Sequence, residues 1–152
     1  GIGNWEETRL DHHSWHFSFW GQDEDRLVAG RERIWLDRFY NELSFNPKTI
    51  NEGVRAHYAA IYAKPGRMHA AFEQFRAFDQ DAIDDKAFVA KGKLTMPVLA
   101  VGGDHSFGPK MAAVMRIAAS NVTEGIIPNS GHWIMEENPT ATIALVTSFL
   151  AK

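Results

Sequence analysis

The sequence predicts an α/β protein in which a helical region precedes a short segment of alternating strands and helices. Apolar residues recur every three or four positions before Lys93, which is typical of amphipathic helices. After Lys93, two short β-branched runs, "MPVLAVGG" and "NVTEGIIP", are each followed by a helical pattern. A strand–helix–strand–helix order implies parallel strands. We therefore expect two domains, a helical one over residues 1–92 and a second one over residues 93–152.

The helical domain begins with "GIGNWEETRLDHHSWHFSFWGQDED", which we expect to be an irregular, packed loop because turn residues lie at both ends. A helix then follows, whose apolar stripe consists of Leu27, Val28, Ile34, Trp35, Phe39, Tyr40 and Leu43. Pro47 ends this helix. A second helix carries Ile50, Val54, Tyr58 and Ile61 and ends at Lys64–Gly66. A third carries Met68, Phe72, Phe75 and Phe78, and a further helix with Ile83 and Phe88 ends near Gly92.

In the second domain, glycine, proline and asparagine mark the ends of strands and the starts of helices more clearly. The run "MPVLAVGG" is continuously apolar, as expected for a strand that is buried on both faces. Gly108–Pro109 begins a helix with proline in its first turn, and Asn138–Pro139 begins another with an asparagine cap. The last helix places Ile143, Val146 and Phe149 or Leu150 on one stripe.

Composition excludes several classes of protein. The net charge of −3 disfavours nucleic acid as the main partner, because nucleic-acid-binding domains carry a basic face. The chain has no cysteine, so disulfides and thiolate metal sites are excluded. No apolar run is long enough for a membrane span, and we expect a soluble protein. Because no signal peptide is visible, the cytoplasm is favoured over secretion, although the compartment stays open.

The strongest chemical signal lies in "NSGHWIMEENP", residues 129–139, where His132 follows the second strand on a glycine-flanked turn. Asp104 follows the first strand in "GGDHSFG". The carboxyl ends of parallel strands meet at one edge of a sheet, so both residues belong to the same edge. A hydrolytic histidine needs a carboxylate on one ring nitrogen and water near the other. We therefore predict that His132 is a general base. Asp104 either orients its ring or simply belongs to a polar turn, because aspartate caps turns and helices readily.

Other candidate residues favour simpler interpretations. His12, His13 and His16 are close in sequence, but no HExxH or similar partner accompanies them, so we expect no metal site. The opening "GIG" is an incomplete dinucleotide motif with no preceding strand, and we expect no cofactor. The stripe with Phe72, Phe75 and Phe78 is either a helix core or the wall of an apolar pocket for small organic molecules.

Taken together, "LTMPVLAVGGDHS", "NSGHWIMEENP" and the closing helix resemble the last strands of the α/β-hydrolase fold. The segments "SWHFSFW", "LVAGRERIWLDRFY" and "YAKPGRMHAAFEQFRAF" resemble the cap domain of its epoxide hydrolase and haloalkanoate dehalogenase branch. The resemblance covers essentially the whole chain. It implies a partial α/β-hydrolase fold, in which a helical cap precedes the last two parallel strands and helices of the core sheet.

The resemblance also implies a two-step reaction. An aspartate attacks carbon to form an alkyl-enzyme ester, and a histidine oriented by an acid then activates water to hydrolyse the ester. His132 matches the histidine, and Asp104 matches the acid position of some members. Other members place the acid after the preceding strand, which would lie upstream of Gly1.

The resemblance also implies which residues of the cap domain contact the substrate. His16 matches a cap histidine that polarises the epoxide oxygen in one bacterial subgroup, and Phe75 stands where its tyrosine partner is expected. Phe17 stands where haloacid-processing relatives have tryptophan. A phenyl ring donates no hydrogen bond, so both pairs differ from the family pattern. We expect His16, Phe17, Phe75 and Trp133 to bind a small apolar organic substrate.

The family's nucleophile elbow and oxyanion-hole segment have no counterpart in these residues, since no Gly-x-Asp/Ser-x-Gly motif occurs. We therefore predict the C-terminal portion of an epoxide hydrolase-like enzyme, active when an N-terminal portion completes it and inactive alone. A haloalkanoate dehalogenase is one alternative. Another is a non-catalytic binding protein that covers its exposed sheet edge by forming a homodimer.

Overall fold

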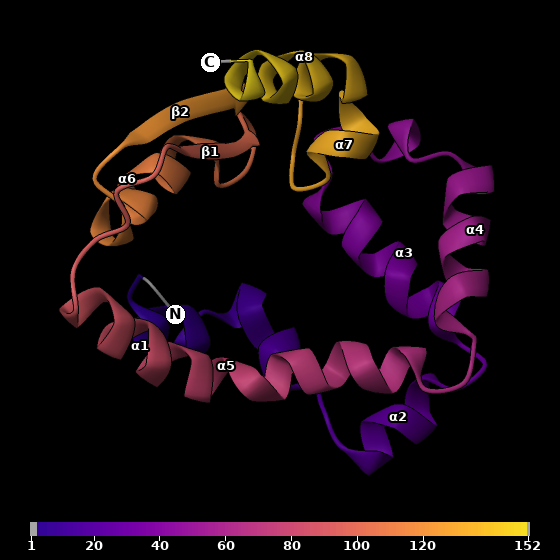
Figure 1. Cartoon of the computed structure of the whole chain (residues 1–152). Coiled ribbons are helices and arrows are strands. Elements are labelled where there is room, and N and C mark those ends of the chain that lie inside the picture. Colours follow the sequence, from indigo (N-terminus) through magenta and orange to yellow (C-terminus); the bar gives the residue numbers. More distant parts are fainter. Residues whose placement is uncertain (1–2, 152) are drawn as a thin grey trace. The chain divides into compact units, whose positions relative to one another are not determined.

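The computed structural model describes residues 3–151, which form two compact units (Figure 1). The first unit contains the residues up to 36 together with 53–91, and the second contains 37–52 together with the residues from 92 onwards. The sequence-based division placed 37–52 with the helical domain. In the structure the backbone of this segment is hydrogen-bonded to the His132 turn, from His132 N to Leu43 O at 2.8 Å.

The first unit is helical. Its elements are α1 (Trp5–Leu10), the 3-10 helix η1 (His12–Ser18), α2 (Gln22–Val28), the start of α3 (Glu32–Leu43), α4 (Glu52–Tyr62) and α5 (Arg67–Ala90). The expectation of an irregular opening loop was therefore wrong. Asn4 caps α1 by accepting a hydrogen bond from Glu7 N through its side chain, and this cap lets a short helix form there.

Two helix boundaries also differ from the sequence-based prediction. The apolar stripe from Leu27 to Leu43 was assigned to one helix, but Gly30 adopts φ 74° and separates α2 from α3. Conversely, the two helices predicted between Met68 and Gly92 form one helix of 24 residues, α5. No glycine or proline interrupts α5, so nothing in its local sequence favours a break.

Aromatic packing forms the core of the first unit. Val28, Met68 and Phe72 are buried, and Phe72 is completely inaccessible to solvent. The side chains that pack around these three are Phe19, Trp35, Tyr62 and Phe75. By contrast, Ile83 and Phe88 near the end of α5 are 62% and 64% exposed. The apolar stripe of α5 thus serves the core mainly through its first half, and Ala82 is a buried residue of its second half.

The second unit carries the predicted sheet. Strands β1 (Val98–Gly103) and β2 (Val122–Ile127) pair in parallel, with Val98 opposite Val122 and Gly103 opposite Ile127. The remaining elements are the 3-10 helix η2 (Pro47–Thr49), α6 (Gly108–Ala118), α7 (Ile134–Glu137) and α8 (Pro139–Leu150). The α/β class and the parallel strands are confirmed.

Helices α6 and α8 lie on opposite faces of this sheet. Gly125 of β2 faces Leu145 of α8, whereas Gly102 of β1 packs against Gly108 at the start of α6. Gly102 pairs with Ile126, the neighbour of Gly125 in β2, and successive strand residues point to opposite faces. Both strands therefore end between two helices, and the loops that follow them lie at one edge.

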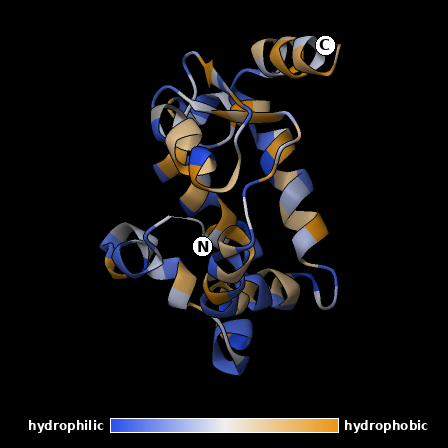
Figure 2. Ribbon diagram, turned by 60° about the vertical axis from the view of Figure 1, so that its left-hand side comes forward, coloured by the Kyte–Doolittle hydropathy of each residue, from blue (hydrophilic) through white to orange (hydrophobic). Residues whose placement is uncertain are grey.

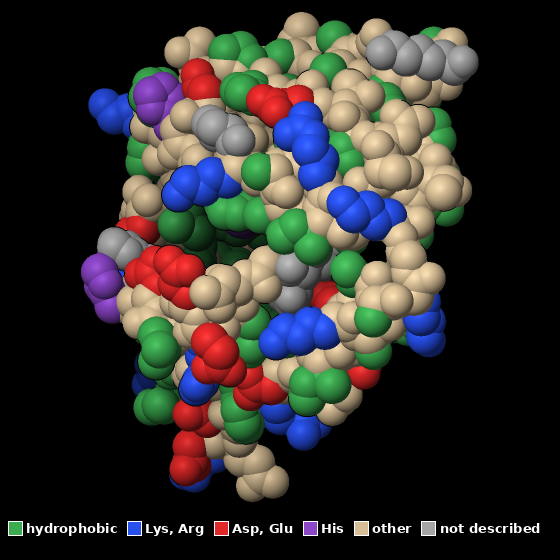
Figure 3. Space-filling view, turned by 90° about the vertical axis from the view of Figure 1, so that its left-hand side faces the viewer, with side chains coloured by type: hydrophobic (Ala, Val, Ile, Leu, Met, Phe, Trp, Pro, Cys, Tyr) green, Lys and Arg blue, Asp and Glu red, His purple; other side chains and the backbone are tan. Residues whose placement is uncertain are grey.

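The apolar stripe of α8 is largely exposed, with Ile143 64% and Leu150 76% accessible to solvent. Hydrophobic residues run along this helix in Figure 2. Within residues 3–151, no helix combines the length and the apolar character needed to cross a bilayer. Lysine, arginine and acidic side chains alternate over the face seen in Figure 3, so this face shows no continuous basic surface.

Candidate active site

The turn that carries His132 is held by hydrogen bonds from its backbone N–H groups. Each of the five consecutive N–H groups from Asn129 to Trp133 has an acceptor. Two carboxylates accept four of them, and the carbonyl oxygen of Leu43 accepts the N–H of His132 at 2.8 Å. Asn129 adopts φ 53°, a left-handed conformation that asparagine tolerates well. The backbone of this turn is therefore fixed in place.

Asp104 is the first of these carboxylates. Its Oδ2 accepts a hydrogen bond from Asn129 N, and its Oδ1 accepts one from Ser130 N, both at 3.0 Å. Asp104 follows β1 directly, and its own N–H donates to Ile127 O at the end of β2. The hydrogen bond from Ser130 N, together with that from Asn129 N, lowers the pKa of Asp104 because both stabilise the ionised carboxylate.

The sequence also predicted that Asp104 orients the His132 ring. The structure brings the two residues to the same edge of the sheet. Among the described residues, however, Asp104 has no hydrogen bond to the imidazole. The side chain near its Oδ1 is instead that of His105, with Nε2 at 3.8 Å. His105 in turn stacks on Phe45, with ring centroids 3.8 Å apart.

Glu137 is the second carboxylate, and sequence reasoning missed it. Its Oε1 accepts hydrogen bonds from Gly131 N at 3.0 Å and Trp133 N at 3.2 Å. Its Oε2 accepts hydrogen bonds from Phe45 N at 2.8 Å and Asn46 N at 3.3 Å. The acidic pair in "MEENP" was a visible signal, but a carboxylate on a short helix is usually a solvated or helix-capping group.

His132 as a residue is exposed to solvent, although neighbouring protein atoms partly desolvate its ring. This partial burial lowers the pKa of His132, because burial disfavours the imidazolium ion, and the nearby charge of Glu137 opposes the shift. An imidazole with a lowered pKa is neutral near pH 7, as a general base must be.

Trp133 lies beside His132 and packs into the second unit. The two ring centroids are 4.8 Å apart, and the rings are nearly perpendicular. The indole Nε1 of Trp133 donates to Phe39 O at 3.3 Å, and its ring meets that of Tyr40 edge-on at 5.3 Å. Trp133 therefore anchors the turn to the end of α3 as well as offering an aromatic surface beside the imidazole.

Two glycines give the turn its close packing. A Cβ atom at Gly103, the last residue of β1, would collide with the carbonyl oxygens of Ser130 and Gly131. A Cβ atom at Gly131 would collide with Leu43 O and would lie 2.6 Å from Phe45 N. Only glycine lets the three segments approach this closely.

The other predicted substrate-binding residues lie in the first unit. His16 meets the Phe17 ring at 4.4 Å and the Phe75 ring at 5.5 Å, both edge-on. The Phe17 and Phe75 centroids are 5.8 Å apart. The structure thus brings these three predicted residues into one aromatic cluster, in which half-buried η1 packs against α5.

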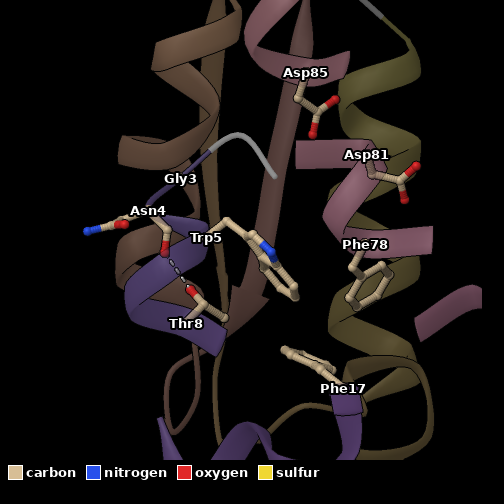
Figure 4. Close-up of a pocket in the computed structure, with 8 residues that line it drawn as sticks. All are labelled: Gly3, Asn4, Trp5, Thr8, Phe17, Phe78, Asp81 and Asp85. Carbon is tan, nitrogen blue, oxygen red and sulfur yellow. Dashed lines mark hydrogen bonds between the residues drawn. The ribbon is translucent and has the colours of Figure 1, made fainter. Parts of the chain in front are cut away.

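A hollow of about 290 Å³ adjoins this cluster in the first unit (Figure 4). Trp5, Phe17 and Phe78 line it, and the carboxylates of Asp81 and Asp85 lie along α5 at its rim. The three rings pack on one another, with centroids 5.1–5.9 Å apart. They therefore form a continuous apolar floor.

Within residues 3–151, no three side chains of histidine, aspartate or glutamate are grouped so that they could hold a metal ion. The predicted site residues comprise an imidazole on a hydrogen-bonded turn in one unit and an aromatic histidine cluster in the other.

The sequence of this chain is similar to that of a known protein. No protein-family model matches it. The chain is 30% identical over 141 residues to a soluble epoxide hydrolase from Corynebacterium sp. (strain C12), an alignment that covers 90% of this chain and 49% of the relative. The chain thus spans about half the length of the curated relative that it matches.

Solved structures agree with this result. Cfl2 from Burkholderia cenocepacia has a TM-score of 0.81 and 33% identity, over 90% of this chain and 47% of its own. The epoxide hydrolase CorEH has a TM-score of 0.80 and 26% identity, over 93% of this chain and 50% of its own. The resemblance to this branch of the α/β hydrolases and the partial fold predicted from the sequence are confirmed.

Proposed function

We propose that this chain, which is homologous to epoxide hydrolases and carries part of the α/β-hydrolase fold, supplies the water-activating half of such an enzyme. In the proposed reaction, an aspartate from an N-terminal portion opens the substrate and forms an alkyl-enzyme ester. His132 then removes a proton from water, and the hydroxide attacks the ester carbonyl to release the product and the free aspartate. The single observation that carries this proposal is the turn around His132, in which five consecutive backbone N–H groups are all hydrogen-bonded.

The turn supports the role of His132 in two ways. Its five backbone amides are bound, so the ring projects from a backbone that needs no reorganisation during the reaction. Partial burial keeps the pKa of His132 low, so the ring can accept a proton near pH 7. A loosely held, fully solvated histidine would offer neither property.

We further propose that the acid that orients His132 comes from the N-terminal portion. Both carboxylate oxygens of Asp104 already accept backbone hydrogen bonds, and these bonds lower the pKa of Asp104. Turning this carboxylate toward the imidazole would release Asn129 N and Ser130 N. Asp104 then contributes by holding the turn, and its substitution disturbs the ring only indirectly.

The proposed substrate is a small apolar epoxide. His16 would donate a hydrogen bond to the epoxide oxygen, and Phe17 and Phe75 would contact the hydrocarbon part. The aromatic character of this cluster supports an apolar substrate. Because Phe75 cannot donate a hydrogen bond, His16 would act without a tyrosine partner.

The partner that we propose is the N-terminal portion of the same hydrolase. Two parallel strands leave unpaired N–H and C=O groups on their outer edges, and such edges pair with further strands. Ile143 and Leu150 of α8 are exposed and apolar, as expected of a face that another segment covers. The relatives are about twice as long as this chain, which leaves room for that segment.

The test is the variant His132→Gln in the complete protein that contains this chain. Glutamine cannot activate water, so the alkyl-enzyme ester should accumulate. An epoxide would add its whole mass to the protein, whereas a haloalkanoate would add its mass less that of the hydrogen halide that leaves. Intact-mass measurement after incubation with styrene oxide, and in parallel with a haloalkanoate, would detect it. No mass increase with either compound would contradict the proposed role of His132.

Product analysis of the unmodified protein identifies the substrate class. Diol formation supports an epoxide hydrolase, and halide release alone would replace the epoxide with a haloalkanoate. Size-exclusion chromatography adds a second criterion. A stable dimer of this chain that turns over neither compound would overturn the proposal in favour of a non-catalytic binding protein.

A further inference from the structure

We propose that Glu137 is a positioning residue for His132, because its carboxylate ties the histidine turn to residues 43–46 at the end of α3. The functional consequence of this tie rests on the proposed role of His132 as a base. The tie itself concerns only contacts within the second unit. Neither the sequence motif nor the expected catalytic set gives Glu137 a role.

The geometry of the tie is specific. One oxygen of Glu137 bonds the residues on both sides of His132, Gly131 and Trp133, at 3.0 and 3.2 Å. The other oxygen bonds Phe45 and Asn46 at 2.8 and 3.3 Å. A carboxylate offers only acceptors, and here it satisfies four N–H groups. A glutamine side chain would place an NH₂ group against one of the two N–H pairs.

The tie joins segments that are far apart in sequence. Residues 43–46 precede the turn by more than eighty positions, and the His132 N–H donates to Leu43 O in the same region. Helix α3, which ends at Leu43, begins in the first unit. Glu137 therefore anchors the histidine turn to the chain segment that leads from the helical unit into the second unit.

Glu137 also acts on His132 through its charge. The charge raises the pKa of His132 against the lowering by burial. Asp104 holds the first two residues of the turn, and His105 lies beside Asp104. They remain in a Glu137 variant. Removing only Glu137 should therefore loosen the second half of the turn and leave the first half bound.

The experiment compares Glu137→Gln with Glu124→Gln in the complete protein. Glu124 is an exposed residue of β2 whose nearest partner is Arg116 at 3.6 Å, so its variant removes the same charge without touching the turn. We expect amide hydrogen exchange at Gly131, Trp133, Phe45 and Asn46 to accelerate at least about tenfold in Glu137→Gln. Exchange at Asn129 and Ser130 should change little.

Two further measurements separate positioning from general loss of structure. NMR titration should show a lower pKa for His132 in Glu137→Gln than in the unmodified protein. Single-turnover kinetics should show ester hydrolysis slowed about 10–100-fold, while formation of the ester keeps its rate. A merely unfolded fraction would reduce both steps equally.

The outcomes distinguish this proposal from the proposed function. Unchanged exchange at the four amides, together with an unchanged pKa of His132, would overturn the positioning role. If no alkyl-enzyme forms in His132→Gln but the amides respond as expected, the positioning contacts of Glu137 are supported and the proposed hydrolase reaction is contradicted. Should Glu137→Gln not fold, Glu137→Asp decides, since its shorter arm reaches only one of the two amide pairs.

Discussion

Asp104 and Ser130 are joined by a hydrogen bond of 3.0 Å that links the residue after β1 to the turn after β2. This bond connects the segments that follow the two parallel strands. It also occupies a carboxylate that the sequence motif assigns to the imidazole. The position of an acid at the correct edge of a sheet therefore does not by itself establish that it orients the histidine.

We expect Asp104→Asn to change how the stability of the protein depends on pH. The folded state lowers the pKa of Asp104, so its contribution to stability is present above pH 3.8 and is lost as the pH falls through the folded value. Denaturant midpoints measured between pH 3 and 7 should fall less steeply with acid in Asp104→Asn. Asp23→Asn, which removes an exposed carboxylate paired with Arg26, is the control for the loss of one negative charge.

We expect His132 to titrate below the ordinary histidine value of 6.5, because burial disfavours its charged form. The stabilising effect of the neutral ring is then present above pH 6.5 and decreases as the pH falls toward the folded pKa. An NMR titration of the ring proton would measure this value, with a peptide of residues 129–135 as the unfolded reference. Equal pKa values in protein and peptide would contradict the prediction.

We expect Phe72→Ala to destabilise the first unit by about 3–5 kcal/mol, since it removes a phenyl ring with no exposed surface and leaves a cavity. Ile83→Ala on the same helix is the matched control. Ile83 is 62% exposed, so its truncation should change the free energy of unfolding by no more than about 0.5 kcal/mol. Chemical denaturation of both variants would measure the difference, and similar values would contradict the assigned core.

We expect Asn138→Ala to lower stability by about 1–2 kcal/mol. Its side-chain oxygen caps α8 by accepting a hydrogen bond from Ala141 N at 3.2 Å, and its amide donates to Pro128 O at 3.0 Å. Asn138→Asp keeps the cap and loses the donor, so it should recover part of the loss. Thermal unfolding would show the order of the three proteins, and an aspartate variant no better than alanine would argue against the cap.

The sequence predicted the second unit better than the first. Strands and helix starts after Lys93 carry local signals, such as the asparagine cap at Asn138 and proline near the start of α6, and the structure confirms both. The boundaries of the helices before Lys93 were predicted wrongly, because an amphipathic stripe continues across Gly30 although one helix ends there and the next begins. Periodicity reports which face is apolar, but it does not report where one helix ends and the next begins.

Part of the candidate site could likewise be predicted from the sequence, and part could not. Sequence order was enough to place Asp104 and His132 at one sheet edge, because parallel strands align their carboxyl ends. It was not enough to show which atoms meet. The contacts of Glu137 with Phe45 and Asn46 join residues more than ninety positions apart, and no local pattern encodes such a pair.

The lack of space beside Gly103 matters to anyone who wishes to redesign this molecule. A methyl group there would push outward the carbonyl oxygens of Ser130 and Gly131, and so displace the neighbouring imidazole. Libraries of variants should consequently leave positions 103 and 131 untouched, because any side chain added there collides with the backbone of the imidazole turn or of the segment that it contacts.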